Sequence, residues 1–332
     1  MHNKMRKSIL FLLIGLSIIG CRKQTIEVYN PSEIDGLNLT VQDPNVFGLQ
    51  AIHFLDVKNG FACGYNGKVV KSIDGGYTWV ELKTNTNLAL FDIFFINKNK
   101  GFVVGEESTL MYTEDAGSNW QKISLDIPDK IEFKSIQFIN DSIGFAIGYS
   151  SILKTTNGGL SWAQEKIDCL GGTMQKIDFD GTLNGMIICV GGKIVSTTDG
   201  GNTWYVNSSI SVQGSVSISV TKNSVVYASG NSKVFKSTDF GNTWVELLNS
   251  PMDNFDLNFV NQNLGFAVGR GNYTGGDFGH SFGAISYTND GGDSWVINKT
   301  ITETGSFFQS SFPSENEGFI VSGNRIINVI KK

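Results

Sequence analysis

Three aspartates and a lysine could together form a site for general acid–base chemistry. Asp92, Asp178 and Asp256 each lie in a short apolar segment with a similar pattern, and Lys176 stands two residues before Asp178. Paired carboxylates can divide the roles of proton donor and proton acceptor. Each aspartate comes from a different segment, so the fold would have to bring the segments together. We expect Asp92, Lys176 and Asp256 to lie near the mouth of a ligand-binding channel, and we assign no catalytic residue.

A second group of chemically capable side chains lies in one unusually long glycine-rich segment, residues 269–286. Aromatic rings there could stack on a sugar or clasp a peptide, and charged groups could fix the polar atoms of a ligand. The alternative is a flexible insertion that binds nothing. We expect a ligand site that uses Arg270, Tyr273, Asp277, Phe278, His280 and Phe282.

These groups must be positioned by a recurring octet, first seen as Ser72-Ile73-Asp74-Gly75-Gly76-Tyr77-Thr78-Trp79. All six tryptophans of the chain close a copy of it, and they lie 41, 42, 42, 40 and 51 residues apart. The Asp74 carboxylate can accept bonds from backbone N–H groups just downstream, and the two glycines can supply the positive φ angles of a tight turn. The octet holds no reacting group, so we interpret it as a structural turn between two strands.

Each octet belongs to a unit of four short strands. The first strand carries an x-Ile-x-Phe pattern, as at Ile52 and Phe54, and the second a Gly-Phe-x-x-Gly pattern, as at residues 60–64. The third strand precedes the octet, and the fourth begins at its tryptophan. No stretch of ten or more residues shows convincing helical periodicity, so the chain is predicted to be an all-β repeat protein.

The octet resembles the Asp-box of the bacterial neuraminidase repeat, found in sialidase-like propellers. The wider unit, from Gly60 to Trp79, is similar to that of the photosystem II assembly-factor family. The resemblance covers roughly residues 49–332 and implies a propeller whose Asp-box turns lie away from the ligand face. Sialidases bind a substrate carboxylate with three arginines. Beyond residue 20 this chain has Arg22, Arg270 and Arg325, and Arg22 precedes the repeats, so a typical sialidase site is excluded. The same count weakens the transfer of the assembly-factor role, because that family uses an arginine-rich patch.

A seventh unit begins near Phe307 but reaches the end of the sequence after three strands, whereas residues 37–41 alternate like an isolated strand. The two fit together, because a circular array that borrows the N-terminal strand leaves no exposed sheet edge. We predict a seven-bladed β-propeller of four-stranded blades over residues 35–332, with the last blade completed by an N-terminal strand.

The N-terminus has the features of an export signal. A basic start at residues 4–7 precedes an apolar run at residues 9–19, which is short for a membrane span and typical of a signal peptide. The run ends in Ile18-Ile19-Gly20-Cys21, which resembles a bacterial lipobox and implies that Cys21 is lipidated. We assign residues 1–20 to a lipoprotein signal peptide and residues 21–34 to a tether. The protein is then an exported lipoprotein, anchored in the cell envelope and facing the periplasm or the cell surface. A plain signal peptide with a chance cysteine is the alternative.

Charge and cysteine content narrow the function classes. Removal of residues 1–20 takes away three basic residues and no acidic one, which lowers the formal net charge from −5 to −8 and disfavours nucleic acid as a partner. Cys63, Cys169 and Cys189 then remain, so we expect no disulfide framework and interpret Cys63 and Cys189 as small buried hydrophobic residues. The spacings match no Cys/His metal motif, and we expect no metal or cofactor.

These observations favour a noncatalytic propeller that binds a protein or a glycan in the cell envelope, with an assembly or scaffold role as one form of this function. The rival hypothesis is a glycan-active enzyme, not a typical sialidase, with its site at the channel mouth.

Overall fold

The computed structural model describes residues 33–34, 37–42, 44–45, 47–127, 130–149, 151–167, 172–212, 214–230, 232–249, 252–271, 282–301 and 306–332. Residues 31–332 form one compact unit, and residues 1–30 are assigned to another that lies outside the described residues. Within the described ranges the regular elements are β-strands and two short 3-10 turns, Tyr65–Gly67 and Lys222–Ser224. No helix among these residues is long and apolar enough to cross a membrane. The prediction of an all-β chain is confirmed.

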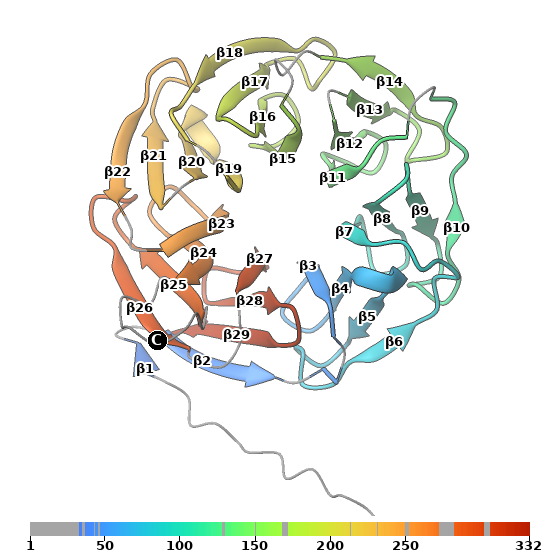
Figure 1. Ribbon diagram of the computed structural model, residues 1–332, viewed down its shortest axis with the longest axis horizontal. Coiled ribbons are helices and arrows are strands. Elements are labelled where there is room, and N and C mark those ends of the chain that lie inside the picture. Colours follow the sequence, from blue (N-terminus) through green and yellow to red (C-terminus); the bar gives the residue numbers. More distant parts are fainter. Residues whose placement is uncertain are drawn as a thin grey trace, which may run out of the picture. The chain divides into compact units, whose positions relative to one another are not determined.

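The strands form seven antiparallel sheets, the blades, arranged in a ring (Figure 1). In blades one to six, four consecutive strands run from the centre of the ring outwards. Blade one holds β3 (Leu49–Phe54), β4 (Gly60–Gly64), β5 (Val69–Ser72) and β6 (Val80–Leu82). Blade two holds β7 (Leu90–Phe95), β8 (Gly101–Gly105), β9 (Leu110–Thr113) and β10 (Gln121–Lys122). Blade three holds β11 (Phe133–Phe138), β12 (Gly144–Gly148), β13 (Ser151–Thr155) and β14 (Ala163–Lys166).

The next three blades repeat this order. Blade four holds β15 (Met174–Phe179), β16 (Gly185–Cys189), β17 (Lys193–Thr197) and β18 (Tyr205–Ser209). Blade five holds β19 (Val216–Val220), β20 (Val226–Gly230), β21 (Lys233–Ser237) and β22 (Val245–Asn249). Blade six holds β23 (Met252–Phe259), β24 (Gly265–Gly271), β25 (Phe282–Thr288) and β26 (Val296–Ile301).

Blade seven joins the two ends of the propeller, as the sequence predicts. It combines β27 (Phe307–Ser311), β28 (Glu317–Ser322) and β29 (Ile326–Lys331) with β2 (Leu37–Gln42), which pairs antiparallel to β29 from Leu37↔Lys331 to Gln42↔Ile326. In Figure 1 the blue β2 lies beside the red β29. One short strand was not foreseen: β1 (Glu33–Ile34) pairs with β2, so the sheet begins two residues before the boundary expected at residue 35.

The Gly-Phe-x-x-Gly pattern follows from the packing of neighbouring blades. The ring of Phe138 at the end of β11 lies over Gly144, where an added Cβ would come within 2.6 Å of it. Phe102 of the preceding blade stacks on Phe138 with ring centroids 4.6 Å apart, and Trp162 meets Phe138 edge-on at 5.9 Å. The glycine therefore makes room for an aromatic cluster that joins two blades. Rings occupy the same place at Phe54 over Gly60, Phe95 over Gly101, Phe179 over Gly185, Phe259 over Gly265 and Phe312 over Gly318.

The octet forms the hydrogen-bonded turn that its sequence predicts. Asp74 Oδ1 accepts the backbone N–H of Thr78 at 2.9 Å, and Oδ2 accepts the Thr78 hydroxyl at 2.6 Å. The first residue has a role that the sequence reasoning missed. The buried Ser72 hydroxyl accepts the Gly76 N–H at 2.8 Å and donates to Asp74 at 2.8 Å. The Trp79 indole N–H closes the turn on the Gly76 carbonyl at 2.8 Å.

Departures from the octet consensus keep the same turn. Asn157 accepts the Ser161 N–H through Oδ1 at 3.0 Å, and Asn119 replaces the usual hydroxyl by donating through its amide to Asp115 at 2.7 Å. Phe240 stands in place of the first glycine, and its own φ is positive, at 54°, as the turn requires at this position.

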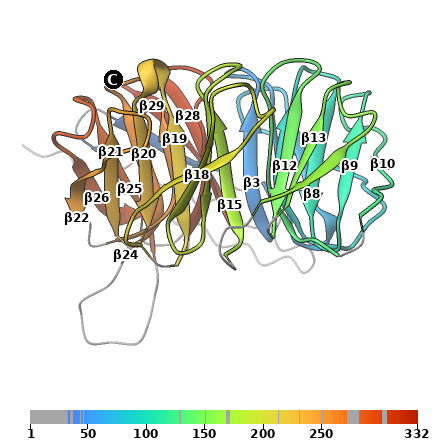
Figure 2. The same ribbon diagram turned by 90° about the horizontal axis from the view of Figure 1, so that it is seen from above.

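The strand order fixes two faces of the ring. The strands run across the thickness of the ring, which Figure 2 shows from the side, and neighbouring strands within a blade are antiparallel. The octet turns share one face with the turns between first and second strands, since the Gly75 N–H donates to the Lys58 carbonyl at 3.0 Å. We call this the octet face. The opposite connector face carries the turns between second and third strands and the connections from one blade to the next.

Candidate functional site

The first strand of each blade lies nearest the centre of the ring (Figure 1) and carries two side chains on the same face, because alternate residues of a strand face the same way. Register with the second strands places the two sets at equivalent heights in successive blades. The set nearer the connector face is Ala51, Asp92, Ser135, Lys176, Ser217, Asp256 and Gln309. The set nearer the octet face is His53, Phe94, Gln137, Asp178, Ser219, Asn258 and Ser311.

Polar side chains of both sets cap the inner edge of the neighbouring first strand. An innermost strand presents unpaired N–H groups along its free edge, and unpaired buried N–H groups are costly. Asp92 accepts the backbone N–H of Ile136 in the next blade at 2.8 Å, and Asp178 accepts that of Val220 at 2.7 Å. The same contact recurs from Gln309 to Ile52, Ser311 to Phe54, Ser217 to Leu257, Ser219 to Phe259 and Asp256 to Ser310. Acceptor residues in these strands therefore hold the ring together.

Asp92, Lys176 and Asp256 all lie in first strands at the centre of the ring, and each has a hydrogen-bond partner in another blade. Their expected ligand role stays a prediction. Lys176 Nζ donates to Asp256 Oδ1 at 2.7 Å across the intervening blade. Asp256 also accepts hydroxyl bonds from Ser217 at 3.0 Å and from Ser310 at 2.8 Å. The Gln309 amide of blade seven donates to Asp92 Oδ1 of blade two at 3.1 Å. Asp92 and Asp256 are buried at 5 % and 2 % exposure, so their oxygens serve blade-to-blade bonds.

Burial and charge set the protonation of the channel groups. Burial raises the pKa of Asp92, and raises that of Asp178 to about 6, against the opposing effects of hydrogen bonds and of Lys176. Burial lowers the pKa of Lys176, but the carboxylates of Asp256, Asp92 and Asp178 outweigh this and raise it overall. Burial lowers the pKa of His53 to about 4, so its neutral ring donates from Nε2 to the Phe95 carbonyl at 3.2 Å.

The glycine-rich segment falls mostly outside the described residues. Tyr273, Asp277, Phe278 and His280 lie there, and the side chain of Phe282 at the start of β25 is not described. Arg270 lies in β24, partly exposed, and bonds Asp253 Oδ2 at 2.9 Å. The expected ligand role of these six residues stays a prediction.

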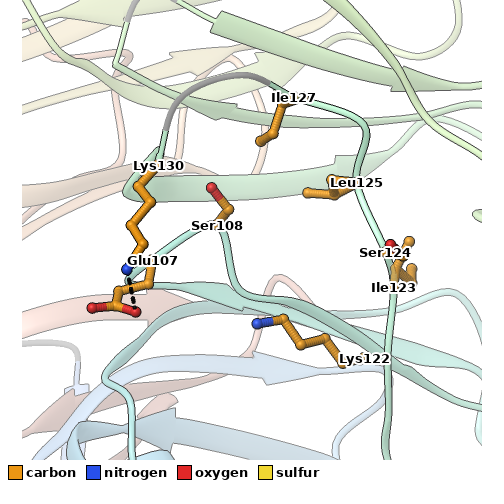
Figure 3. A pocket seen from close by; sticks show the side chains of 8 residues that line it. All are labelled: Glu107, Ser108, Lys122, Ile123, Ser124, Leu125, Ile127 and Lys130. Atoms are coloured by element: carbon orange, nitrogen blue, oxygen red, sulfur yellow. Dashed lines mark hydrogen bonds and ion pairs between the residues drawn. The ribbon is translucent and has the colours of Figure 1, made fainter.

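A crevice that the sequence did not signal opens on the connector face between blades two and three (Figure 3). It has a volume of about 480 Å³ and is lined by Glu107, Ser108, Lys122, Ile123, Ser124, Leu125, Ile127 and Lys130. The residues before β11 alternate apolar and polar, which is a strand-like signal, but the crevice depends on a turn 15 residues earlier. No sequence pattern within either segment indicates that residues 107–108 and residues 122–130 lie side by side.

The cysteines depart from expectation. Cys189 is disulfide-bonded, whereas Cys63 is free and buried. The expectation of a small buried hydrophobic residue holds for Cys63. Cys189 is also fully buried in the hydrophobic core of blades three and four, but it is disulfide-bonded, which was not expected. Within the described residues no three His, Cys, Asp or Glu side chains are grouped as a metal site would require.

Comparison with known proteins supports the predicted resemblance. The profile of the family described as "Photosynthesis system II assembly factor YCF48" matches residues 78–219. The "Photosystem II assembly lipoprotein Ycf48" of Synechococcus sp. (strain CC9902) is 24% identical over 321 residues, which cover 94% of this chain and 92% of that protein. The chain is thus an Asp-box propeller similar to the photosystem II assembly factors.

Solved structures show the same fold. One described as "YCF48 bound to D1 peptide" aligns with a TM-score of 0.71 and 20% identity, covering 92% of this chain and 98% of that one. A streptogramin B lyase structure aligns with a TM-score of 0.69 and 10% identity, covering 90% of this chain and 99% of that one. A binding protein and an enzyme share this architecture, so the site must decide the function.

Proposed function

We propose that this chain is a lipid-anchored, noncatalytic propeller that binds a protein in the cell envelope and supports the assembly of a larger complex. The observation that carries the proposal is the state of the channel aspartates. Asp92 and Asp256 hold neighbouring blades together through their oxygens, and a catalytic carboxylate needs an oxygen that can reach a substrate.

The assembly role is supported by the likeness to the Synechococcus assembly lipoprotein, which extends over nearly the whole of both chains. We propose the role of an assembly factor for this chain, but we do not propose a photosystem as the complex that it helps to assemble. Beyond the tether the chain offers two arginines, and Arg270 is bonded to Asp253, so an arginine-rich surface is not part of the proposal.

Export and anchoring rest on two features. Residues 1–20 followed by Cys21 resemble a lipoprotein signal, and relatives of this chain are named lipoproteins. The disulfide at Cys189 suits an oxidising compartment outside the cytosol. Replacement of Cys21 by alanine is expected to leave the protein unprocessed or to release it from the membrane fraction.

Capture of the partner in intact cells tests the proposal. The tagged protein is cross-linked in the envelope, solubilised in detergent and purified beside an unrelated tagged lipoprotein. We expect a small set of envelope proteins to be enriched over that control. Equal recovery from both baits would overturn the binding function, and retention on an immobilised glycan without any protein partner would favour a carbohydrate ligand instead.

A further inference from the structure

The connection from blade two to blade three, residues 123–132, differs from its counterpart between blades four and five. In that counterpart Ile210 and Val212 are buried at 5 % exposure, and the Ile210 N–H bonds the Gly192 carbonyl at 2.9 Å. Here the alternating apolar side chains remain half-buried and line the crevice of Figure 3. They are Ile123, Leu125 and Ile127, packed against the core of blades two and three.

The backbone of this segment is available for pairing. The Ile123 N–H donates to the Leu110 carbonyl at 2.9 Å and so continues the ladder between β9 and β10. Beyond it, the backbone groups of residues 124–127 have no hydrogen-bond partner among the described residues, and exposure alternates residue by residue as in a strand. An unpaired strand-like edge beside apolar pockets is the arrangement that extended peptides use when they add to a sheet.

The opposite wall is preformed. Glu107 and Ser108 adopt positive φ angles of 50° and 58°, and the Ser108 hydroxyl accepts the Ile131 N–H at 2.8 Å. Such a turn is held by its bonds to the connector and needs no rearrangement to receive a ligand. The volume of about 480 Å³ lies within the range of small-ligand pockets and suits one or two side chains.

Charge at the crevice indicates the chemistry of the occupant. Lys130 pairs with Glu107 at 3.0 Å, whereas Lys122 has no ion pair within the described ranges. An occupant with a carboxylate beside Lys122 would give this lysine an ion-pair partner.

We propose that this crevice is the docking site for an extended segment of the partner protein. The segment pairs its backbone with residues 124–127, inserts an apolar side chain between Leu125 and Ile127, and places a carboxylate beside Lys122. This inference rests on the proposed function in one respect, that the partner is a protein.

A defined peptide tests the docking site directly. The probe is a fluorescein-labelled, end-blocked peptide, Thr-Leu-Thr-Asp-Thr-Thr, whose apolar and acidic side chains fall on the same face of a strand. Fluorescence anisotropy measures its binding to the folded propeller. We expect Leu125→Glu to weaken binding about tenfold or more, because it puts a charge into the apolar crevice. Lys122→Glu should weaken binding about fivefold, since attraction becomes repulsion. The control Lys222→Glu makes the same charge change on the octet face and should leave binding unchanged.

A second probe tests backbone pairing. Methylation of the backbone nitrogens in alternate positions of the peptide removes the donors on one edge, and we expect one of the two methylated registers to lose binding. Melting curves of the protein variants establish that they are folded. Absence of binding by the wild-type protein, or equal binding by the Leu125→Glu variant, overturns the docking site. A partner captured from cells by both wild-type and Leu125→Glu protein also overturns it while leaving the proposed function standing.

Discussion

Asp178 is a buried carboxyl group whose titration should affect the stability of the fold. Burial raises its pKa to about 6 from an ordinary 3.8. Between these two values the folded protein binds a proton that the unfolded chain does not, so the contribution to the free energy of unfolding falls as pH rises through the window. Asp178→Asn should remove this dependence, and Gln137 can turn its amide to keep the contact.

Thermal melting at pH 4.5 and pH 7.0 measures this effect. The variant should gain stability relative to wild type on going to the higher pH, whereas exposed Asp126→Asn should track wild type at both. A constant offset between Asp178→Asn and wild type would show that the carboxyl does not titrate in this window.

A second prediction concerns the hydroxyl group of the first residue in the octet. Thr197 is buried; its hydroxyl accepts the Gly201 N–H at 2.9 Å and donates to Asp199 at 2.8 Å. Thr197→Val keeps the shape but leaves a buried N–H unpaired, which should cost about 1–3 kcal/mol in urea unfolding. The exposed neighbour is the control, and Thr198→Val should change stability by less than about 0.5 kcal/mol. Equal effects at both positions would contradict the role of the hydroxyl.

Some of these residue contacts could be predicted from the sequence and others could not. The bond from Asp74 to Thr78 was predictable because both partners lie within one turn. The roles of Asp92, Ser135 and Gln309 were not, because their partners lie in other blades and depend on register across the channel. Asp92 and Asp256, which suggested a ligand site, accept backbone N–H groups of the neighbouring blades.

At the scale of elements, blade five shows that the glycine and the aromatic ring form a coupled pair. Val220 replaces the ring and pairs with Val226 in place of the glycine, so a larger residue in one strand accompanies a smaller one in the other. Phe138 and Gly144 make the usual pair in blade three. Gly144→Val should be strongly destabilising by itself, because the new side chain meets the Phe138 ring.

The double variant Phe138→Val with Gly144→Val copies blade five into blade three. We expect a favourable coupling of at least about 1 kcal/mol in a double-mutant cycle, since neighbours that share space are not additive. Additive losses would indicate that the glycine is needed for its backbone and not for the ring.

Gln42 is an element-scale weakness in the closing strand. It occupies the place that Leu82 and Leu247 take against the octet glycines of blades two and six, and both its polar side-chain atoms are buried without a partner among the described residues. Gln42→Leu should raise the free energy of unfolding by about 1–3 kcal/mol, because it removes unpaired buried groups. A loss of stability would mean that those atoms are satisfied in solution, for example by bound water.

Elements with a repeated signal were predictable and isolated ones were not. Six copies of one octet determine the blade, and the missing fourth strand of the last unit points to its N-terminal replacement. The short β1 has two residues and no repeat, and it forms because β2 offers an open edge. The crevice beside Leu125 likewise arises where two segments meet in the fold, so no repeated sequence signal predicted it.

At the scale of the whole molecule, stability depends on closing the ring. Leu37 and Leu39 of β2 are buried in the core that joins blades six and seven, and β2 covers the full length of β29. Deletion of residues 33–42 should expose the edge of β29 with its buried isoleucines and remove that core contact. Open edges of this kind pair with other chains, so we expect a large loss in melting temperature and aggregation in size-exclusion chromatography.

Deletion of residues 33–34 is the control, because β1 contacts β2 through two residue pairs and should be dispensable. A synthetic peptide of residues 35–42 supplied in trans should restore a monomer if the missing strand is the cause. A truncated protein that melts like the full chain, with no response to the peptide, would show that the ring holds without its N-terminal strand.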